Sequence, residues 1–324
     1  MPQAGTSAAA HAEHRLRAAA ALVGGIFVFS LQDVILKYAA GTYPLTEAVA
    51  IRSAAGIIIL FAVLQYRGHL RQILSRRSGL LALRGLILIF AYGTYYLAFP
   101  AMKLAEVVTL FFVAPIFITA LAYPLLGEKV SLVRWLAVLA GFGGVIVTYL
   151  PQLGLVGAAD GFTLDWALLL PVVAALAYGL AQLMARRLGR TETATVMGFY
   201  QNLVFLVGSL VLALLFELGG FAHPGMHPSL AFLVRGWIFG NWHDLVLLAV
   251  CGPISAFGTV LLSHAYRLAE ANFVASFEYT GLIWATLSGF LFWGEVPDLY
   301  MIAGAALIVG AGLYMLFVGR REQM

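Results

Sequence analysis

The sequence predicts an all-α polytopic membrane protein with ten transmembrane helices. Hydrophobic residues make up 62% of its 324 positions and charged residues only 10%. Because a soluble domain carries about 25% charged residues, this chain has too little polar surface to cover a water-soluble globule. Its apolar residues also fall into ten runs of about 20 residues, the length with which a helix crosses a bilayer. A cytosolic enzyme, a nucleic-acid-binding module and a secreted scaffold are thereby excluded.

The ten apolar runs each end at charged residues, Gly or Pro, and they lack the alternation of barrel strands. The first five predicted spans cover 18–40, 48–66, 79–99, 105–126 and 132–150. The second five cover 166–184, 195–215, 245–265, 273–292 and 300–318. Residues 1–17 and 319–324 are then terminal segments, and 151–165 connects the two halves.

Basic residues orient the predicted helices. If the N-terminus lies in the cytoplasm, nearly all Lys and Arg outside the apolar runs fall in cytoplasmic segments. Arg84, near the start of the third run, is counted with them. Only Lys103 and Arg235 fall on the opposite face. Since cytoplasmic loops are enriched in Lys and Arg, the sequence predicts an inner (plasma) membrane protein with both termini in the cytoplasm and 151–165 in the periplasm.

The two halves of the sequence repeat a pattern. Leu104-Ala105-Glu106 opens the fourth span, which closes at Gly127-Glu128, and Leu268-Ala269-Glu270 opens the ninth, which closes at Gly294-Glu295. Each repeat, 18–150 and 166–318, holds five spans. Because five is an odd number of spans, the second repeat must cross the membrane in the opposite orientation to the first. Inverted repeats are common in secondary transporters, whose substrate site lies between the two halves.

The paired Gly-Glu turns, Arg52-Ser53 of the second span and the run Phe277-Glu278-Tyr279-Thr280 resemble the EamA branch of the drug/metabolite transporter superfamily. The resemblance extends over 18–320. It implies a basket of ten helices around a central cavity, lined by the first, third, fourth, sixth, eighth and ninth, with the fifth and tenth at the side. Members export amino acids and other metabolites or import nucleotide-like and vitamin substrates. An exporter of aromatic amino acids of the YddG type is the subtype we expect.

Four ionisable residues are candidates for gating or ion pairing: Asp33, Lys37, Arg52 and Glu106. An ionisable group at membrane depth faces the bundle interior and needs a partner. Asp33 and Lys37 lie one helical turn apart, so they form either a proton or substrate relay or a self-neutralising pair near the outer surface. Arg52 is expected to meet Glu47 or Asp33, in a functional or a structural pair. Glu106 is either a gate or a solvated helix end.

Glu278 is the strongest candidate for binding a substrate or a proton. It lies five residues into the ninth predicted span, between Phe277 and Tyr279. Because burial disfavours a charged carboxylate, Glu278 either holds a proton, binds a substrate ammonium or is bonded to the eighth helix or to backbone groups. His264, near the basic end of the eighth span, is its expected neighbour, either in a proton role or as a structural histidine.

Aromatic and amide side chains complete the predicted binding site. Tyr92 and Tyr96 share one face of the third span, and Tyr178 and Gln182 share one face of the sixth. Aromatic walls with a few polar groups suit a flat organic substrate, although ordinary bundle packing explains each ring equally well. The predicted substrate-binding residues are therefore Tyr92, Tyr96, Tyr178, Gln182, His264, Glu278, Tyr279 and Trp284.

Three prolines inside predicted spans are candidate hinges: Pro115, Pro171 and Pro253. Each removes a backbone hydrogen bond and bends its helix. In a transporter such bends serve alternating access, and bends without function are as common.

The sequence therefore predicts a secondary transporter that exports small organic metabolites, most of all amino acids and aromatic ones first, by alternating access. The alternatives are an importer of nucleotide-like or vitamin substrates in the same fold, an intramembrane enzyme, and a non-transporting scaffold. No catalytic constellation, phosphate-binding loop or regular metal-ligand spacing is present in the sequence, so neither enzymatic activity, a cofactor nor a metal is expected. The expected partners are a small-molecule substrate and membrane lipid, without nucleic acid, in a monomer or alternatively a dimer.

Overall fold

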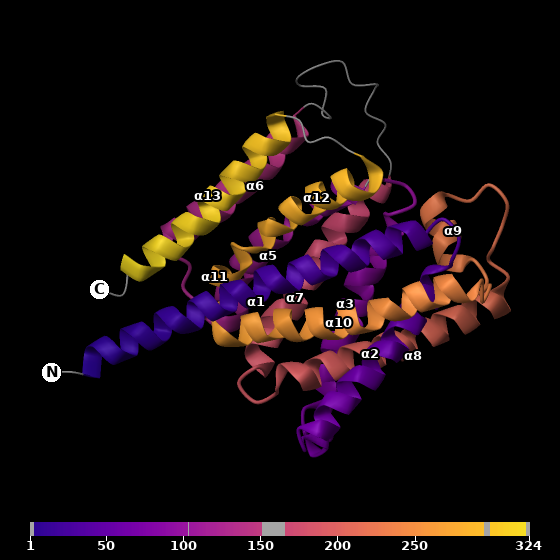
Figure 1. Cartoon of the computed structure of the whole chain (residues 1–324), viewed down its shortest axis with the longest axis horizontal. Coiled ribbons are helices and arrows are strands. Elements are labelled where there is room, and N and C mark those ends of the chain that lie inside the picture. Colours follow the sequence, from indigo (N-terminus) through magenta and orange to yellow (C-terminus); the bar gives the residue numbers. More distant parts are fainter. Residues whose placement is uncertain (1–2, 103, 151–165, 295–298, 322–324) are drawn as a thin grey trace.

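The computed structural model describes residues 3–102, 104–150, 166–294 and 299–321. Every regular element in these ranges is a helix (Figure 1), which confirms the all-helical class. Seven helical stretches are long and apolar enough to cross a bilayer: Glu13–Ala39, Leu45–Tyr66, Ser78–Leu97, Val107–Leu126, Trp166–Leu188, Ala194–Gly219 and Trp242–Leu268. The chain is therefore a multi-pass membrane protein, and the full ten-span arrangement stays a prediction.

The elements follow one another without strands in the described ranges. The first half forms α1 (Gln3–Ala39), α2 (Leu45–Tyr66), the 3-10 turn η1 (Leu70–Ile73), α3 (Ser78–Leu97), α4 (Leu104–Phe111), α5 (Ala114–Leu126) and α6 (Leu132–Tyr149). The second half forms η2 (Trp166–Leu168), α7 (Leu169–Leu188), α8 (Ala194–Gly219), α9 (Pro228–Val234), α10 (Trp242–Leu268), α11 (Ala271–Ala275), η3 (Glu278–Thr280), α12 (Gly281–Trp293) and α13 (Leu299–Arg321). Helix α9, in the connector after α8, was not predicted, and α1 includes most of the terminal segment 1–17.

Helices from the two halves of the chain pack against one another. Helix α1 lies along α10, α2 contacts α8 and α10, and α3 contacts α7 and α8. Helices α6 and α13 lie side by side at the margin of the bundle, where Figure 1 shows them apart from α2, α8 and α10. The core is thus built from contacts between the halves, and each half depends on the other.

The fourth and ninth predicted spans are both broken. Helix α4 ends at Phe111, and α5 begins at Ala114 with Pro115 in its first turn. Proline suits this position because the first residues of a helix have no intrahelical acceptor for an N–H. The ninth span divides into α11, η3 and α12. Both spans were predicted as continuous helices, and the structure corrects this.

Two of the three candidate hinge prolines do not lie in helix interiors. Pro115 begins α5, and Pro171 lies in the first turn of α7 after η2. Pro253 lies inside α10. The expectation that each proline bends a helix from within is therefore wrong for Pro115 and Pro171, and the hinge roles of all three prolines stay predictions.

Both Gly-Glu turns start with a glycine that ends a helix. Gly127 follows α5 with a φ of 71°, and Gly294 follows α12 with a φ of 69°. This left-handed conformation is strained for residues with a β-carbon, so glycine is the residue that ends a helix in this way. The glycine of the repeated motif therefore ends its helix in the same way in both halves.

Helices α2 and α10 approach so closely that one position requires glycine. A β-carbon at Gly252 would lie 2.8 Å from the carbonyl oxygen of Arg52 and from the nitrogen of Gly56, and closer still to the β-carbon of Ala55. These atoms belong to the backbone of α2 or are fixed to it. Because no side-chain rotation can move these atoms away, a larger residue at position 252 must push the two helices apart.

We expect Gly252→Ala to lower the thermal unfolding midpoint of the detergent-purified protein, because overpacking a close contact costs about 1–3 kcal/mol. Gly79→Ala is the matched control, since a β-carbon at Gly79 meets no atom within 4 Å. Alanine also favours the helix at that position, so the control should be neutral or slightly stabilising. Equal midpoints for the two variants would contradict the close crossing of α2 and α10.

Candidate functional site

A cavity lies between helices of both halves of the chain. Its walls come from α1, α3, α4, α5, α7, α10, η3 and α12. These elements correspond to the six spans for which the family resemblance implies a lining role. Most of the wall is apolar and aromatic, and its rings are Phe29, Tyr92, Tyr95, Phe111, Phe112 and Tyr178. Two carboxyl residues, Asp33 and Glu278, also line it.

The Glu278 carboxyl is held in place by two tyrosines. Its Oε1 accepts a hydrogen bond of 2.7 Å from the Tyr266 hydroxyl and one of 3.0 Å from the Tyr178 hydroxyl. Only 6% of Glu278 is exposed. The break between α11 and α12 places Glu278 in η3, so the carboxyl projects from a turn into the cavity wall.

The α10 side chain that reaches Glu278 is Tyr266 and not His264. His264 is exposed, whereas Tyr266, two residues further on, is fully buried. Residues two apart point to different sides of a helix, which explains the difference. The prediction of His264 as the neighbour of Glu278 is therefore wrong. Tyr266 was missed because the predicted eighth span ended at residue 265, whereas α10 continues to Leu268.

Asp33 lies in the cavity wall and binds a different tyrosine. Its Oδ2 accepts a hydrogen bond of 3.1 Å from the Tyr95 hydroxyl. Lys37 donates to the carbonyl oxygens of Phe99 and Met102 after α3. Within the described residues no ion pair joins Asp33 to Lys37, so the expected one-turn pair is not formed.

Arg52 is almost fully buried and lies among aromatic rings. Its Nη1 donates to the Tyr96 hydroxyl at 3.3 Å. The guanidinium carbon lies 5.2 Å from the Phe205 ring centre, 5.6 Å from that of Tyr96 and 6.0 Å from that of Tyr92. Ring faces attract a cation, so the cluster stabilises the buried charge. The predicted direct pairs with Glu47 and Asp33 are not formed among the described residues.

Glu47 takes part in contacts at the end of α1 and the start of α2. Its carboxylate accepts the backbone N–H groups of Ile238 and Phe239 at 3.0 Å and 3.1 Å. Close by, the Tyr43 hydroxyl donates to Asp244 at 2.7 Å, and this bond raises the pKa of Tyr43 to about 12. The connector between α9 and α10 is thereby fastened to the start of α2, and the connector between α1 and α2 is fastened to the start of α10.

The remaining predicted binding residues fall outside the cavity wall. Tyr279 donates to the carbonyl oxygen of Val138 at 3.0 Å, which ties η3 to α6. Trp284 packs on Phe27 with ring centres 4.8 Å apart. Tyr96 and Gln182 are buried beside the cavity. Of the predicted set, the structure therefore brings together Tyr92, Tyr178 and Glu278 in the wall, and the side chain of Glu106 lies outside the described residues.

Arg84 is a buried cation that the sequence analysis had assigned to a cytoplasmic segment. Only 2% of it is exposed, within α3. Its Nε donates to the carbonyl oxygen of Ala181 at 3.1 Å and its Nη2 to the Ser263 hydroxyl at 3.4 Å. The assignment is wrong, and the apolar residues on both sides of Arg84 were the signal that it belongs to the span.

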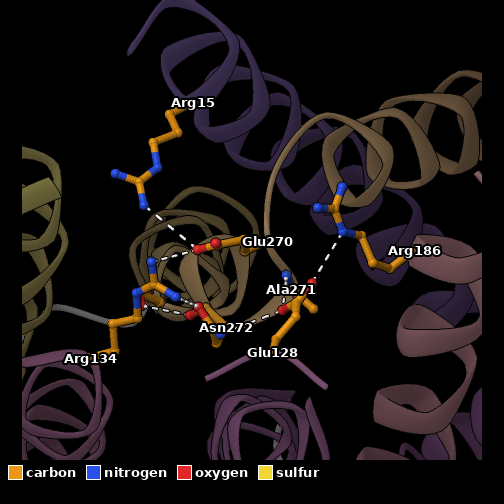
Figure 2. A network of polar contacts seen from close by, with 8 residues as sticks. Arg15, Glu128, Arg134, Arg186, Glu270, Ala271 and Asn272 are labelled. Atoms are coloured by element: carbon orange, nitrogen blue, oxygen red, sulfur yellow. Dashed lines mark hydrogen bonds and ion pairs between the residues drawn. The ribbon is translucent and has the colours of Figure 1, made fainter. Parts of the chain in front are cut away.

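A polar network joins the two halves at the end of the bundle where α10 meets α11 (Figure 2). Glu270 forms ion pairs with Arg134 and, at 3.6 Å, with Arg15. Arg134 also donates to the Asn272 side chain at 2.5 Å. We call the set the end network, and its members are Arg15, Glu128, Arg134, Arg186, Glu270, Ala271 and Asn272.

Glu128 of the first Gly-Glu turn lies at the centre of the end network. It accepts from Arg186 Nε at 3.2 Å, from the backbone N–H of Ala271 at 2.9 Å and from Asn272 Nδ2 at 3.4 Å. The first half thus contacts α7 and α11 of the second half through one carboxylate. Every residue from Ala271 to Glu278 is buried, so a packed segment separates the end network from the cavity.

Comparison with known proteins identifies the family. The sequence profile of the EamA-like transporter family matches residues 16–150. This first half of the chain belongs to the EamA-like transporter family. Curated relatives that match about nine tenths of the chain are transporters as well, so the protein is a transporter of the drug/metabolite superfamily and not an enzyme.

Curated relatives of this EamA-like transporter carry different substrate names. A riboflavin transporter of Rhizobium johnstonii is 32% identical over 67% of this chain and 63% of its own length, less than two thirds. An S-adenosylmethionine uptake transporter of Rickettsia prowazekii is 25% identical over 90% of both chains. The pseudopaline exporter CntI of Pseudomonas aeruginosa is 27% identical over 88% of this chain and 90% of its own.

One crystal structure resembles the fold of this EamA-like transporter. The two chains are 17% identical and superpose with a TM-score of 0.70, over 95% of this chain and 99% of the other. At this identity the similarity concerns the fold alone.

We expect Glu128→Gln to lower the thermal unfolding midpoint, because loss of a partly buried charge-assisted bond to Arg186 costs about 1–3 kcal/mol. Glu13→Gln is the matched control, since Glu13 pairs with Arg17 one turn away and both are exposed. Such exposed pairs contribute about 0.5 kcal/mol or less. A shift of the same size in both variants would contradict the central place of Glu128 in the end network.

Proposed function

We propose that this protein is a secondary transporter that moves small organic metabolites by alternating access through the cavity between its halves. The observation that carries the proposal is the cavity itself, which combines aromatic walls with two carboxyl groups held by tyrosines. Pockets of this kind bind flat organic molecules, with the rings supplying contact area and the few polar groups fixing orientation.

The proposed architecture has two inverted five-helix repeats, 18–150 and 166–318, joined by 151–165. Two observations support it. The fourth span of each half is broken into shorter helices, and each ends at a glycine in the left-handed conformation. Discontinuous helices at corresponding positions of two halves are typical of transporter substrate sites.

The end network supports an alternating-access cycle. Its ion pairs connect the halves at one end of the bundle, while the cavity wall extends the other way, to Leu104 of α4 and Ser288 of α12. In the proposed cycle these bonds break when the cavity opens toward this end of the bundle. They form again when the cavity opens toward the opposite end. We propose that this end faces the cytoplasm, because cytoplasmic segments are enriched in basic residues.

The substrate that we propose first is an amino acid, above all an aromatic one, which the protein exports. The ring-lined wall around Tyr92, Tyr95 and Tyr178 favours a flat side chain, and Glu278 suits an ammonium group. The second candidate is the import of a vitamin or a nucleoside-like compound, because relatives carry the names of riboflavin and S-adenosylmethionine transporters. Membrane lipid surrounds the protein, and the monomer contains the whole cavity.

Counterflow in proteoliposomes tests the proposal. Liposomes are loaded with aromatic amino acids, riboflavin or S-adenosylmethionine, one compound at a time. For at least one of these classes of compound, the exchange of labelled tracer should be saturable. We expect Glu278→Gln to slow this exchange by about tenfold, the effect of about 1.4 kcal/mol of lost interaction. Glu217→Gln, at an exposed position of α8, is the control and should exchange at the wild-type rate.

Two results of that experiment would contradict the proposal. If no class of compound exchanges above protein-free liposomes, the transport function itself is wrong. If Glu278→Gln leaves both the rate and its pH dependence unchanged, the role of Glu278 is wrong.

The proposed topology is tested by fusions in an inner membrane. We expect green fluorescent protein to fluoresce at either terminus, because both lie in the cytoplasm when ten spans cross the membrane. Alkaline phosphatase inserted within 151–165 should be active in the periplasm. An active phosphatase fused to the C-terminus would contradict ten spans.

A further inference from the structure

The cavity presents acidic groups to its ligand and no basic group among the described residues of its wall. Asp33 and Glu278 are the ionisable carboxyls there, and the other polar groups are hydroxyls of serine and tyrosine. We propose that the protein selects substrates that carry a positive charge beside a flat ring, with Glu278 and Asp33 as two separate cation-binding positions. This inference rests on the proposed transport function and narrows its substrate class.

The Glu278 position is preorganised for a cation. Tyr266 and Tyr178 both donate to the same oxygen, Oε1. The other oxygen, Oε2, then remains for a donor in the cavity that Glu278 lines. A hydrogen bond from a charged donor to a carboxylate is about twice as strong as one between neutral groups, so an ammonium group is favoured at this position.

The Asp33 position lies further along α1. Ile26 of α1 lies beside Gly281, one turn after Glu278, because a β-carbon added at Gly281 would lie 3.3 Å from the Ile26 side chain. Asp33 follows Ile26 by seven residues, which is about 10 Å along a helix. The two carboxyls are therefore too far apart to share one proton or one small cation, and each has its own tyrosine partner.

A strip of rings connects the two positions. The Tyr95 ring, whose hydroxyl binds Asp33, lies 5.0 Å from the Phe111 ring. Phe111 in turn lies 5.2 Å from Tyr178, whose hydroxyl binds Glu278. All three rings line the cavity. A flat ring that stacks on this strip has a carboxyl within reach at either end, and the ring faces attract a cation as well.

The buried arginines make their contacts behind the cavity wall, and Arg52 also interacts electrostatically with Asp33. Arg52 packs on the rings of Tyr92, Tyr96 and Phe205, and Arg84 bonds to α7 and α10. Neither lines the cavity. An anionic ligand such as a phosphate ester would approach two carboxyls without a facing cation, and such like-charge contacts are a common means of rejecting a ligand.

Three indole ligands of different charge test the inference on the purified full-length protein. Tryptamine is a cation, tryptophan a zwitterion and indole-3-propionate an anion, and the ring is the same in all. Measured by calorimetric titration, tryptamine should bind about tenfold or more tightly than indole-3-propionate, with tryptophan between them. Asp33→Asn and Glu278→Gln should each reduce this ratio, and Glu217→Gln, which removes an exposed carboxyl, should leave it unchanged.

The outcomes separate the inference from the transport function. Equal affinity for the three ligands, tighter binding of the anion, or no binding of any of them overturns the charge preference. If tracer exchange in proteoliposomes is saturable while no charge preference is found, transport stands and the inference fails. If the cation binds as expected but nothing exchanges, the cation site stands and the transport function fails. Unfolding midpoints of the variants show whether a lost preference reflects the site or a loss of folding.

Discussion

The structure depends on one constraint: inside a bilayer, a polar or charged group must find its partner within the protein. Arg52 is surrounded by rings, Arg84 bonds to α7 and α10, and Glu278 takes hydroxyls from two helices. In each case the partners come from across the bundle. Arg52 and Arg84 therefore join the first half to the second, and Glu278 joins three elements of the second half, where lipid offers no such contacts.

The same contacts connect the ends of the molecule to its centre. Glu270 and Asn272 belong to the end network, and Glu278 begins the next turn of the same buried segment. A rearrangement that opens the network moves α11, and α11 leads directly into η3. In the proposed cycle, opening at one end would reach the cavity wall at the break between α11 and α12, because a short helix between two turns shifts with less loss of hydrogen bonds than a continuous one.

Composition and run length were sufficient to predict an all-helical membrane protein, because the bilayer permits few alternatives. The two Gly-Glu turns could also be recognised in the sequence. Their glycines, Gly127 and Gly294, have the left-handed backbone conformation that favours glycine. Side-chain partners were not predictable in the same way. Lys37 lies one turn from Asp33 but bonds to the backbone after α3, and Tyr266 takes the place assigned to His264. Those choices follow from helix rotation and crossing, which the periodicity of one sequence does not determine.

The central claim is that the substrate occupies the cavity between the halves, and a single cysteine in its wall tests this most directly. Ser288 of α12 lines the cavity, and Cys251 is the one native cysteine, so Ser288→Cys in a Cys251→Ser background gives one reactive site. A bulky thiol reagent should block tracer exchange, and saturating substrate should slow the labelling. Full labelling at an unchanged rate in the presence of substrate, with exchange intact afterwards, would contradict the claim.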